Sequence, residues 1–252
     1  MGEGQTLRNI KLILAYDGTA YHGWQVQAEN QKPTVQDRVE KALAVLTREN
    51  IRVAGAGRTD AGVHALGQVA TFLTGSPIPI ERFPAAINSI LPDDIVTTKA
   101  QEMPPDFHAR FSARGKTYRY LIDNRQYPDP FWRNYALHHP YPLDVQAMAK
   151  AAGQFTGKFD WRGFCASGSG RKNFVRTIVE SHISQEGSRI VFETTGDGFL
   201  YNMVRIMAGT LLLVGRGKIE PDGIRDIILS QERNKAGPTV PSHGLYLIKV
   251  IY

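Results

Sequence analysis

The sequence is poor in the residues that build covalent or metal frameworks. It has a single cysteine, Cys165, among 252 residues, so an intramolecular disulfide is excluded and a reducing compartment is expected. We interpret Cys165 as a small packed side chain rather than a nucleophile. The seven histidines show no spacing typical of a zinc site. We therefore predict neither a disulfide scaffold nor a bound metal.

Long hydrophobic runs are also missing. No apolar stretch approaches the roughly 20 residues that cross a membrane, and the first residues lack the apolar stretch of a signal peptide. These features favour a cytoplasmic protein without membrane contact. The 42% hydrophobic content over 252 residues still permits a sizeable core, in one large or two modest domains.

Acidic residues are fewer than basic ones. Thirty lysines and arginines stand against 24 aspartates and glutamates, which gives a net charge of +6. This excess is typical of proteins that bind an acidic partner such as nucleic acid, although many basic proteins bind none. Composition alone therefore indicates RNA or DNA only as one class of partner.

Glycines are concentrated around one charged segment, residues 55–65, which reads GAGRTDAGVHA. The flanking runs 51–54 and 68–72 alternate between apolar and polar residues, so the glycines mark a connection between two strands. The spacing does not fit a dinucleotide-binding loop, which also requires a following helix. We therefore predict no nucleotide cofactor.

Asp60 is the carboxylate of this segment. An aspartate beside glycine commonly caps backbone N–H groups in a turn. Arg58 lies two residues earlier in an extended stretch, so its guanidinium can project to the same side and lower the pKa of Asp60. His64 follows, and we interpret it as a hydrogen-bonded support. An acid/base pair of Asp60 and His64 in a small-molecule enzyme is the alternative.

Hydrophobic periodicity predicts the same order of elements twice. The first half has a strand at 10–17, a helix from the Thr34 cap to Arg48, two strands around residues 55–65, a helix at 80–91 and a strand at 95–103. The second half has a strand at 116–122, a helix at 143–155, strands at 175–184 and 188–195, a helix from Leu200, an extra helix at 221–229 and a strand at 245–251. The prediction is an α+β protein with two β-α-β-β-α-β halves, 1–104 and 105–252.

Five segments resemble motifs of the tRNA pseudouridine synthase A family, in the same order along nearly the whole chain. They are residues 21–25 (YHGWQ), 57–65 (GRTDAGVHA), 107–120 (FHARFSA followed by KTYRY), 199–211 (FLYNMVRIM followed by GTL) and 244–247 (GLYL). One departure precedes the last motif, where residues 240–243 read VPSH instead of an Ala-Pro-Ala-like run. This departure affects the expected presentation of Leu245.

The resemblance implies a fold, a reaction and a partner. The two halves would be ferredoxin-like (RRM-like) units with antiparallel sheets, joined around a basic cleft that takes the RNA. The activity would be isomerisation of uridine to pseudouridine in the anticodon stem-loop of tRNA, at tRNA positions 38, 39 and/or 40. The enzyme would be a homodimer that needs no metal, redox or nucleotide cofactor. Asp60, Tyr118, Arg205 and Leu245 would surround the target base, with Asp60 as the essential residue.

Each of these residues also has an ordinary interpretation. Arg205 lies in an apolar helix, where a guanidinium is costly unless it is paired or reaches solvent at the helix edge. The resemblance names Asp60 as its partner. Tyr118 alternates with Tyr120 and would ordinarily pack across strands, whereas the resemblance implies stacking on the base and help with the final deprotonation. Arg58 either pairs with Asp60 or fills the gap left by the flipped uridine, and we favour the second role.

Other basic residues are candidates for phosphate contacts, or for ordinary solvated surface. They are Arg110, Arg114, Lys116, Arg119 and Arg125, interleaved with Phe107, Phe111, Tyr118 and Tyr120, and a second group of Arg162, Arg171, Lys172 and Arg176 beside the Gly/Ser-rich run 167–170. Stacking combined with charge is typical of sites for unpaired RNA. A non-catalytic RNA-binding module that uses the same cleft without Asp60 is therefore the other alternative.

Overall fold

The computed structural model describes residues 7–26, 33–168, 170 and 172–252. The chain forms two compact units, the first made of Met1–Arg114 and Leu247–Tyr252 and the second of Gly115–Tyr246. These limits differ from the expected ranges 1–104 and 105–252 at two places. Residues 105–114 and residues 247–252 belong to the first unit, although the sequence predicts them in the second half.

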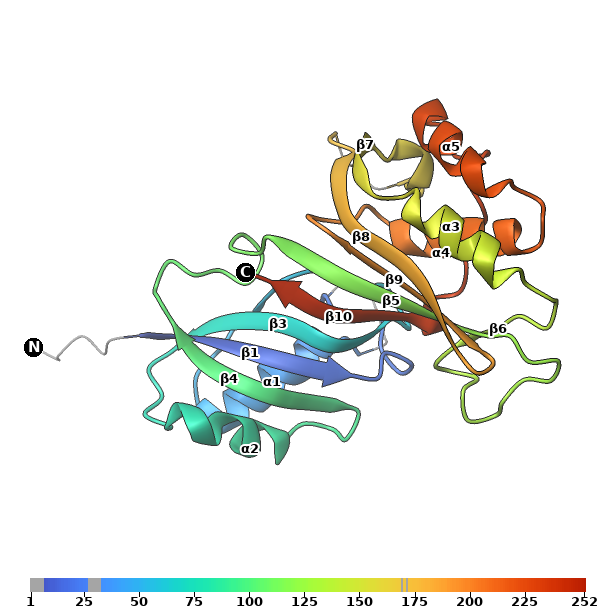
Figure 1. Ribbon diagram of the computed structural model, residues 1–252. Coiled ribbons are helices and arrows are strands. Elements are labelled where there is room, and N and C mark those ends of the chain that lie inside the picture. Colours follow the sequence, from blue (N-terminus) through green and yellow to red (C-terminus); the bar gives the residue numbers. More distant parts are fainter. Residues whose placement is uncertain (1–6, 27–32, 169, 171) are drawn as a thin grey trace, which may run out of the picture. The chain divides into compact units, whose positions relative to one another are not determined.

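The first unit combines sheet strands with two helices (Figure 1). Its elements are β1 (Arg8–Tyr16), α1 (Val35–Thr47), β2 (Ala54–Gly55), β3 (His64–Thr74), the 3-10 turn η1 (Ile80–Arg82), α2 (Phe83–Asn88), β4 (Ile95–Met103) and the end of β10 (Leu245–Ile251). The strand order is β4-β1-β3-β10, with β2 paired to β3. The predicted β-α-β-β-α-β order of the first half is confirmed.

Alternation along β1 shows which side of this sheet is packed. Ile10, Leu12 and Leu14 are fully buried, whereas Lys11 and Ile13 between them are partly exposed. Successive side chains of a strand point to opposite faces, so the first set forms the core with the helices. Lys11 and Ile13 belong to the other face.

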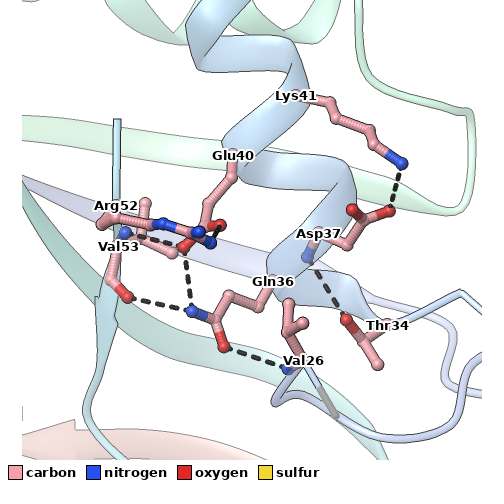
Figure 2. Close-up of polar contacts among 8 residues, drawn as sticks. All are labelled: Val26, Thr34, Gln36, Asp37, Glu40, Lys41, Arg52 and Val53. Carbon is pink, nitrogen blue, oxygen red and sulfur yellow. Dashed lines mark hydrogen bonds and ion pairs between the residues drawn. The ribbon is translucent and has the colours of Figure 1, made fainter. Parts of the chain in front are cut away.

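Helix α1 begins as predicted, because the Thr34 hydroxyl accepts a hydrogen bond from the Asp37 N–H at 3.3 Å (Figure 2). The strand predicted at 51–54 is shorter than expected, since only Ala54 enters β2. Figure 2 shows the reason. The Val53 N–H donates to the Glu40 carboxylate at 3.0 Å and the Val53 C=O accepts from the Gln36 amide at 3.3 Å. Two side chains of α1 thus satisfy the backbone groups that a strand partner would take.

The second unit contains a set of mostly antiparallel strands. Its elements are β5 (Gly115–Asp123), β6 (Leu137–His138), α3 (Val145–Gly153), β7 (Gly157–Asp160), η2 (Arg162–Phe164), β8 (Val175–Glu186), β9 (Arg189–Gly196), α4 (Met203–Gly215), η3 (Pro221–Gly223), α5 (Ile224–Ser230) and η4 (Ser242–Gly244). The strand order is β5-β9-β8-β7, and β6 pairs with β5 in parallel. Helices α3 and α4 pack against each other. The α+β class is confirmed, and β6 and β7 are two short strands that periodicity did not predict.

Two helices start or end differently from the prediction. Helix α2 covers six residues after a 3-10 turn, instead of the whole range 80–91, with Pro84 in its first turn. Helix α4 starts at Met203 rather than near Leu200, because Asn202 adopts a left-handed conformation with φ of 59°. Asparagine tolerates this conformation better than most residues.

Candidate active site

The loop that carries Asp60 is held by close backbone contacts with residues 16–24. Gly23 has φ of +79°, and a Cβ at this position would lie 2.3 Å from the Thr59 carbonyl oxygen. A Cβ on Gly18 would lie 2.1 Å from the Val63 carbonyl oxygen. Both positions therefore require glycine, which has no Cβ, and at Gly23 glycine also adopts the positive φ without strain. This packing explains why the motifs at 21–25 and 57–65 occur together.

Hydrogen bonds fix both ends of the same loop. The Trp24 N–H donates to the Thr59 carbonyl at 3.1 Å, and the buried Thr59 hydroxyl lies 2.8 Å from the Tyr16 hydroxyl. Within the loop, the Val63 N–H donates to the Asp60 carbonyl at 3.1 Å. Burial raises the pKa of Tyr16 to about 12, so this hydroxyl keeps its proton at neutral pH. The Asp60 side chain is half-buried and starts from a backbone held on both sides.

His64 lies at the start of β3 and supports this loop. Its ring is only 2% exposed, and the Gly18 N–H donates to its Nδ1 at 3.0 Å. Asp17 Oδ1 lies 3.1 Å from the same nitrogen. The arrangement agrees with the interpretation of His64 as a support that joins β3 to residues 17–18.

Arg58 is exposed, in contrast to its neighbour Thr59. Among the residues that the structure describes, none forms a hydrogen bond or ion pair with the Arg58 guanidinium. A cation that its own unit does not neutralise is suited to a contact with an anionic ligand. This observation favours a role of Arg58 in filling the gap left by the flipped uridine over a fixed ion pair with Asp60.

Tyr118 belongs to β5 of the second unit. Its side chain is buried and meets the Phe199 ring edge to face, with the centroids 5.1 Å apart. Tyr120, two residues along the strand, is fully buried and donates its hydroxyl to the Pro241 carbonyl at 2.7 Å. Burial raises the pKa of Tyr120 far above its usual value. Tyr120 is thus a core residue, not the RNA-stacking ring considered for the first basic group.

Arg205 lies in the first turn of α4 and is half-buried. Its Nε donates to the Val240 carbonyl and its Nη1 to the Asn202 side-chain oxygen, both at 2.7 Å. These neutral acceptors orient the guanidinium within the second unit. Sequence reasoning did not predict the role of Asn202, although an asparagine just before an apolar helix is a recognisable signal for a helix boundary.

Residues 240–243, where the sequence departs from the family pattern, contact Arg205 and Tyr120 through backbone atoms. Val240 and Pro241 position Arg205 and Tyr120 through their backbone carbonyls. Gly244 then packs on Tyr120, where a Cβ would lie 2.8 Å from the ring. Leu245 follows at the start of β10 and is buried. The segment can therefore vary in sequence and still present Leu245.

The structure places the five predicted site residues in two groups. Asp60 and Arg58 share one loop of the first unit, and Tyr118, Arg205 and Leu245 belong to the second unit. Within the second unit, the segment 240–245 links the surroundings of Arg205 and Leu245. That all five surround one base stays a prediction.

Three of the candidate phosphate-binding arginines form ion pairs with acidic side chains of the protein, so they are less available to phosphates. Arg119 contacts Glu193 at 2.9 Å, Arg162 contacts Asp160 at 2.8 Å, and Arg125 contacts both Asp123 and Asp129 at 2.8 Å. These hydrogen bonds with Arg125 lower the pKa of Asp123. Ser169 and Arg171 of the second group lie outside the described residues.

The described part of the chain contains no group of three histidine, cysteine or acidic side chains placed to hold a metal ion. Nor does it contain a helix that is long and apolar enough to cross a membrane.

Comparison with known proteins identifies the family. The sequence matches the family described as tRNA pseudouridine synthase over residues 12–112 and 151–252. It is 53% identical to the tRNA pseudouridine synthase A of Acetivibrio thermocellus, over 98% of this chain and 100% of that protein. It is 52% identical to the protein of the same name from Moorella thermoacetica, over 96% of this chain and 99% of that one. This chain belongs to the tRNA pseudouridine synthase family.

Proposed function

We propose that this protein isomerises uridine to pseudouridine in the anticodon stem-loop of tRNA, at tRNA positions 38, 39 and/or 40, with Asp60 as the essential residue. Family membership makes it an isomerase that acts on tRNA. The observation that carries the assignment of Asp60 is its loop. The ungapped motif at 57–65 is folded against residues 16–24, so that one carboxylate is presented from a fixed backbone.

The reaction requires little from the protein beyond such a carboxylate. The bond between the sugar C1′ and uracil N1 breaks, the uracil rotates, and a bond forms between C1′ and uracil C5. N1 gains a proton and C5 loses one, so substrate and product have the same composition. Asp60 can attack the sugar, add to the uracil ring or remove a sugar proton, and each role requires its ionised form.

The other residues receive supporting roles in this proposal. Arg205, oriented by Val240 and Asn202, pairs with Asp60 and keeps it ionised. Tyr118 stacks on the flipped uracil and assists the loss of the C5 proton. Arg58, exposed and without a partner among the described residues, fills the space that the flipped nucleotide leaves. Leu245 packs against the base. The proposal includes a cytoplasmic homodimer.

Two alternatives make different demands on Asp60. A binding module needs the cations but not the carboxylate. A small-molecule enzyme with an Asp60–His64 pair needs a His64 ring that reaches a substrate, but this ring is only 2% exposed and its Nδ1 lies against the Gly18 N–H and Asp17. The geometry therefore favours the isomerase over the second alternative.

The test is the formation of pseudouridine in unmodified tRNA transcripts, mapped by nucleotide, with wild type and Asp60→Asn compared. We expect product confined to the anticodon arm, and none with the variant at unchanged tRNA affinity. Tight tRNA binding by a wild type that makes no product would favour the binding module. Wild-type protein with neither binding nor activity would contradict the proposal altogether.

A further inference from the structure

One strongly exposed aromatic side chain of the first unit is not among the residues assigned above. Phe111 is 77% exposed. Its ring packs on the His108 imidazole, with centroids 4.5 Å apart, and the Arg110 guanidinium lies 5.7 Å from its centroid. Single exposed apolar residues are common, so exposure alone assigns no role to Phe111.

The loop that carries Phe111 is rigidly attached to the sheet of its own unit. The Asn9 amide donates to the carbonyls of Pro104 and Phe107, at 2.9 and 2.8 Å. The Ala109 N–H donates to the Thr71 hydroxyl at 3.2 Å, and the Ala109 carbonyl accepts from the Tyr252 hydroxyl at 2.8 Å. The sheet therefore fixes residues 104–109 at four points, from three different strands or strand ends.

The tip of the loop is fixed as well. The His108 Nδ1 accepts the Arg110 N–H at 3.0 Å, and the Ser112 N–H donates to the His108 carbonyl at 3.0 Å. Phe111 is thus held in place by a closed turn instead of being free to collapse onto the surface. A side chain ordered before binding loses less conformational entropy when a ligand packs on it.

Cations without acidic partners lie on the loop that carries Phe111 and on the strands that hold this loop. The Lys11 ammonium lies 5.5 Å from the Phe107 centroid and 5.6 Å from that of Tyr252. Partial burial and the nearby Lys99 both lower the pKa of Lys11. Within the described residues, neither these two lysines nor Arg110 forms an ion pair, and the neighbouring Glu102 is bound to Arg8. The loop 104–112 itself carries one exposed carboxylate, Asp106, so the three cations outnumber it and the surroundings of the loop are suited to a polyanion.

The second unit offers a contrasting exposed ring. Phe131 is 81% exposed, in a loop whose Arg125 is neutralised by Asp123 and Asp129. The Phe131 loop also contains Arg133, which donates to the Pro130 carbonyl at 2.6 Å. The two rings are similarly exposed, but only Phe111 has a guanidinium over its ring among the contacts of the described residues. Exposure does not separate the two rings, whereas the position of a cation against the ring does.

We propose that Phe111 is a stacking platform for an unpaired base of the RNA substrate, and that Arg110 and Lys11 bind phosphates beside that base. Aromatic stacking tolerates any base, and cations next to the ring hold the backbone. Phe111 is then a positioning residue, which contributes to tRNA binding and not to the bond changes at the target uridine. The inference rests on the proposed function, because it assumes an RNA substrate.

The experiment measures the dissociation constant of an unmodified tRNA transcript for the full-length protein. The Phe111 series is placed in the Asp60→Asn background, so that no turnover intervenes. We expect Phe111→Ala and Phe111→Leu to raise Kd by about 5- to 100-fold, the range for loss of one base stack. Phe111→Trp, which keeps an aromatic face, retains affinity. Phe131→Ala is the matched control and leaves Kd unchanged.

Kinetics and salt dependence give two further readouts. In the active background, Phe111→Ala raises KM and leaves kcat unchanged at saturating tRNA, because the residue acts on binding. Lys11→Gln lowers the slope of log Kd against log salt by about one, as expected for one lost phosphate contact.

Several outcomes would overturn the inference. Equal Kd values for Phe111→Ala and Phe131→Ala would remove any special role of the ring. Full affinity with Phe111→Leu would indicate apolar packing without stacking. A change of sedimentation coefficient in place of Kd would identify a contact between protein copies. Failure of the proposed function is seen separately, as a wild type that forms no pseudouridine while the Kd series is still measurable.

Discussion

The two units support their candidate residues in different ways. In the first unit, Asp60 and Arg58 lie on a loop between β2 and β3, shaped by the contacts of Gly18 and Gly23. In the second, Tyr118 lies within strand β5 and Arg205 within helix α4, both among core side chains. One unit thus presents its candidate residues from a loop, and the other presents them from regular elements.

Because of this difference, substitutions in the two units are expected to affect reaction rate and folding stability to different extents. A loop residue with a half-buried side chain can change with little effect on packing, so its substitution reports on the reaction. A residue in a buried helix also contributes to folding, and its substitution reports on both. The predictions below use this contrast, beginning with the largest effect.

Asp60→Asn is expected to have the largest effect on rate and a small effect on folding. The amide keeps the shape and the acceptor oxygen but lacks the negative charge, so turnover falls by at least about 10²- to 10⁴-fold. The free energy of unfolding changes by about 1 kcal/mol or less. Single-turnover assays and denaturant titration measure the two quantities. A large loss of stability would contradict the expectation that a substitution in this loop changes the rate without changing folding.

Gly209→Ala is expected to destabilise the second unit most. The added Cβ in α4 would lie 2.0 Å from the Pro238 carbonyl oxygen, which is backbone and cannot move aside easily. Overpacking of this kind costs about 1–3 kcal/mol or more. Gly153→Ala is the matched control, since the last residue of α3 has no heavy atom near its Cβ position. That change should stabilise by about 0.4–1 kcal/mol. Similar unfolding midpoints for the two variants would refute the prediction.

Most of the fold could be predicted because its elements have clear local signals. Strands β4 and β10 have the predicted bounds, and Thr34 caps α1 as expected from its sequence. The errors have long-range causes. Val53 does not continue as a strand because Glu40, 13 residues earlier, takes its N–H, and no local pattern contains that information.

The candidate site could be predicted through its motifs but not through its supports. The family resemblance predicts Asp60 and Arg205 as site residues, and these roles stay predictions. The acceptors that orient Arg205 are a backbone carbonyl and an asparagine side chain, which the motifs do not indicate. A carbonyl is present at every residue, so the sequence gives no signal for Val240. The sequence also does not indicate that residues 105–114 belong to the first unit, because this depends on contacts with Asn9, Thr71 and Tyr252.

Arg205→Ala is expected to reduce both rate and stability. Removal of the guanidinium leaves the Val240 carbonyl and the Asn202 side chain without their donor, which costs about 1–3 kcal/mol. Arg205→Lys keeps the charge but not the two-donor geometry, and should recover part of the stability and less of the rate. Thermal unfolding and pseudouridine assays on both variants test this. An alanine variant with full stability and no activity would show that Arg205 behaves like the loop residues.

Tyr118→Phe is expected to have the smallest effect, because it removes only a hydroxyl. The ring keeps its edge-to-face contact with Phe199, so stability changes by less than about 1.5 kcal/mol and tRNA affinity is retained. If the hydroxyl assists loss of the C5 proton, that step becomes slower and limits the rate. A tRNA with 5-deuterated uridine should then show a larger kinetic isotope effect with the variant than with wild type. An unchanged isotope effect would leave Tyr118 with a stacking role alone, and Tyr118→Leu, which removes the ring, would then weaken tRNA binding instead.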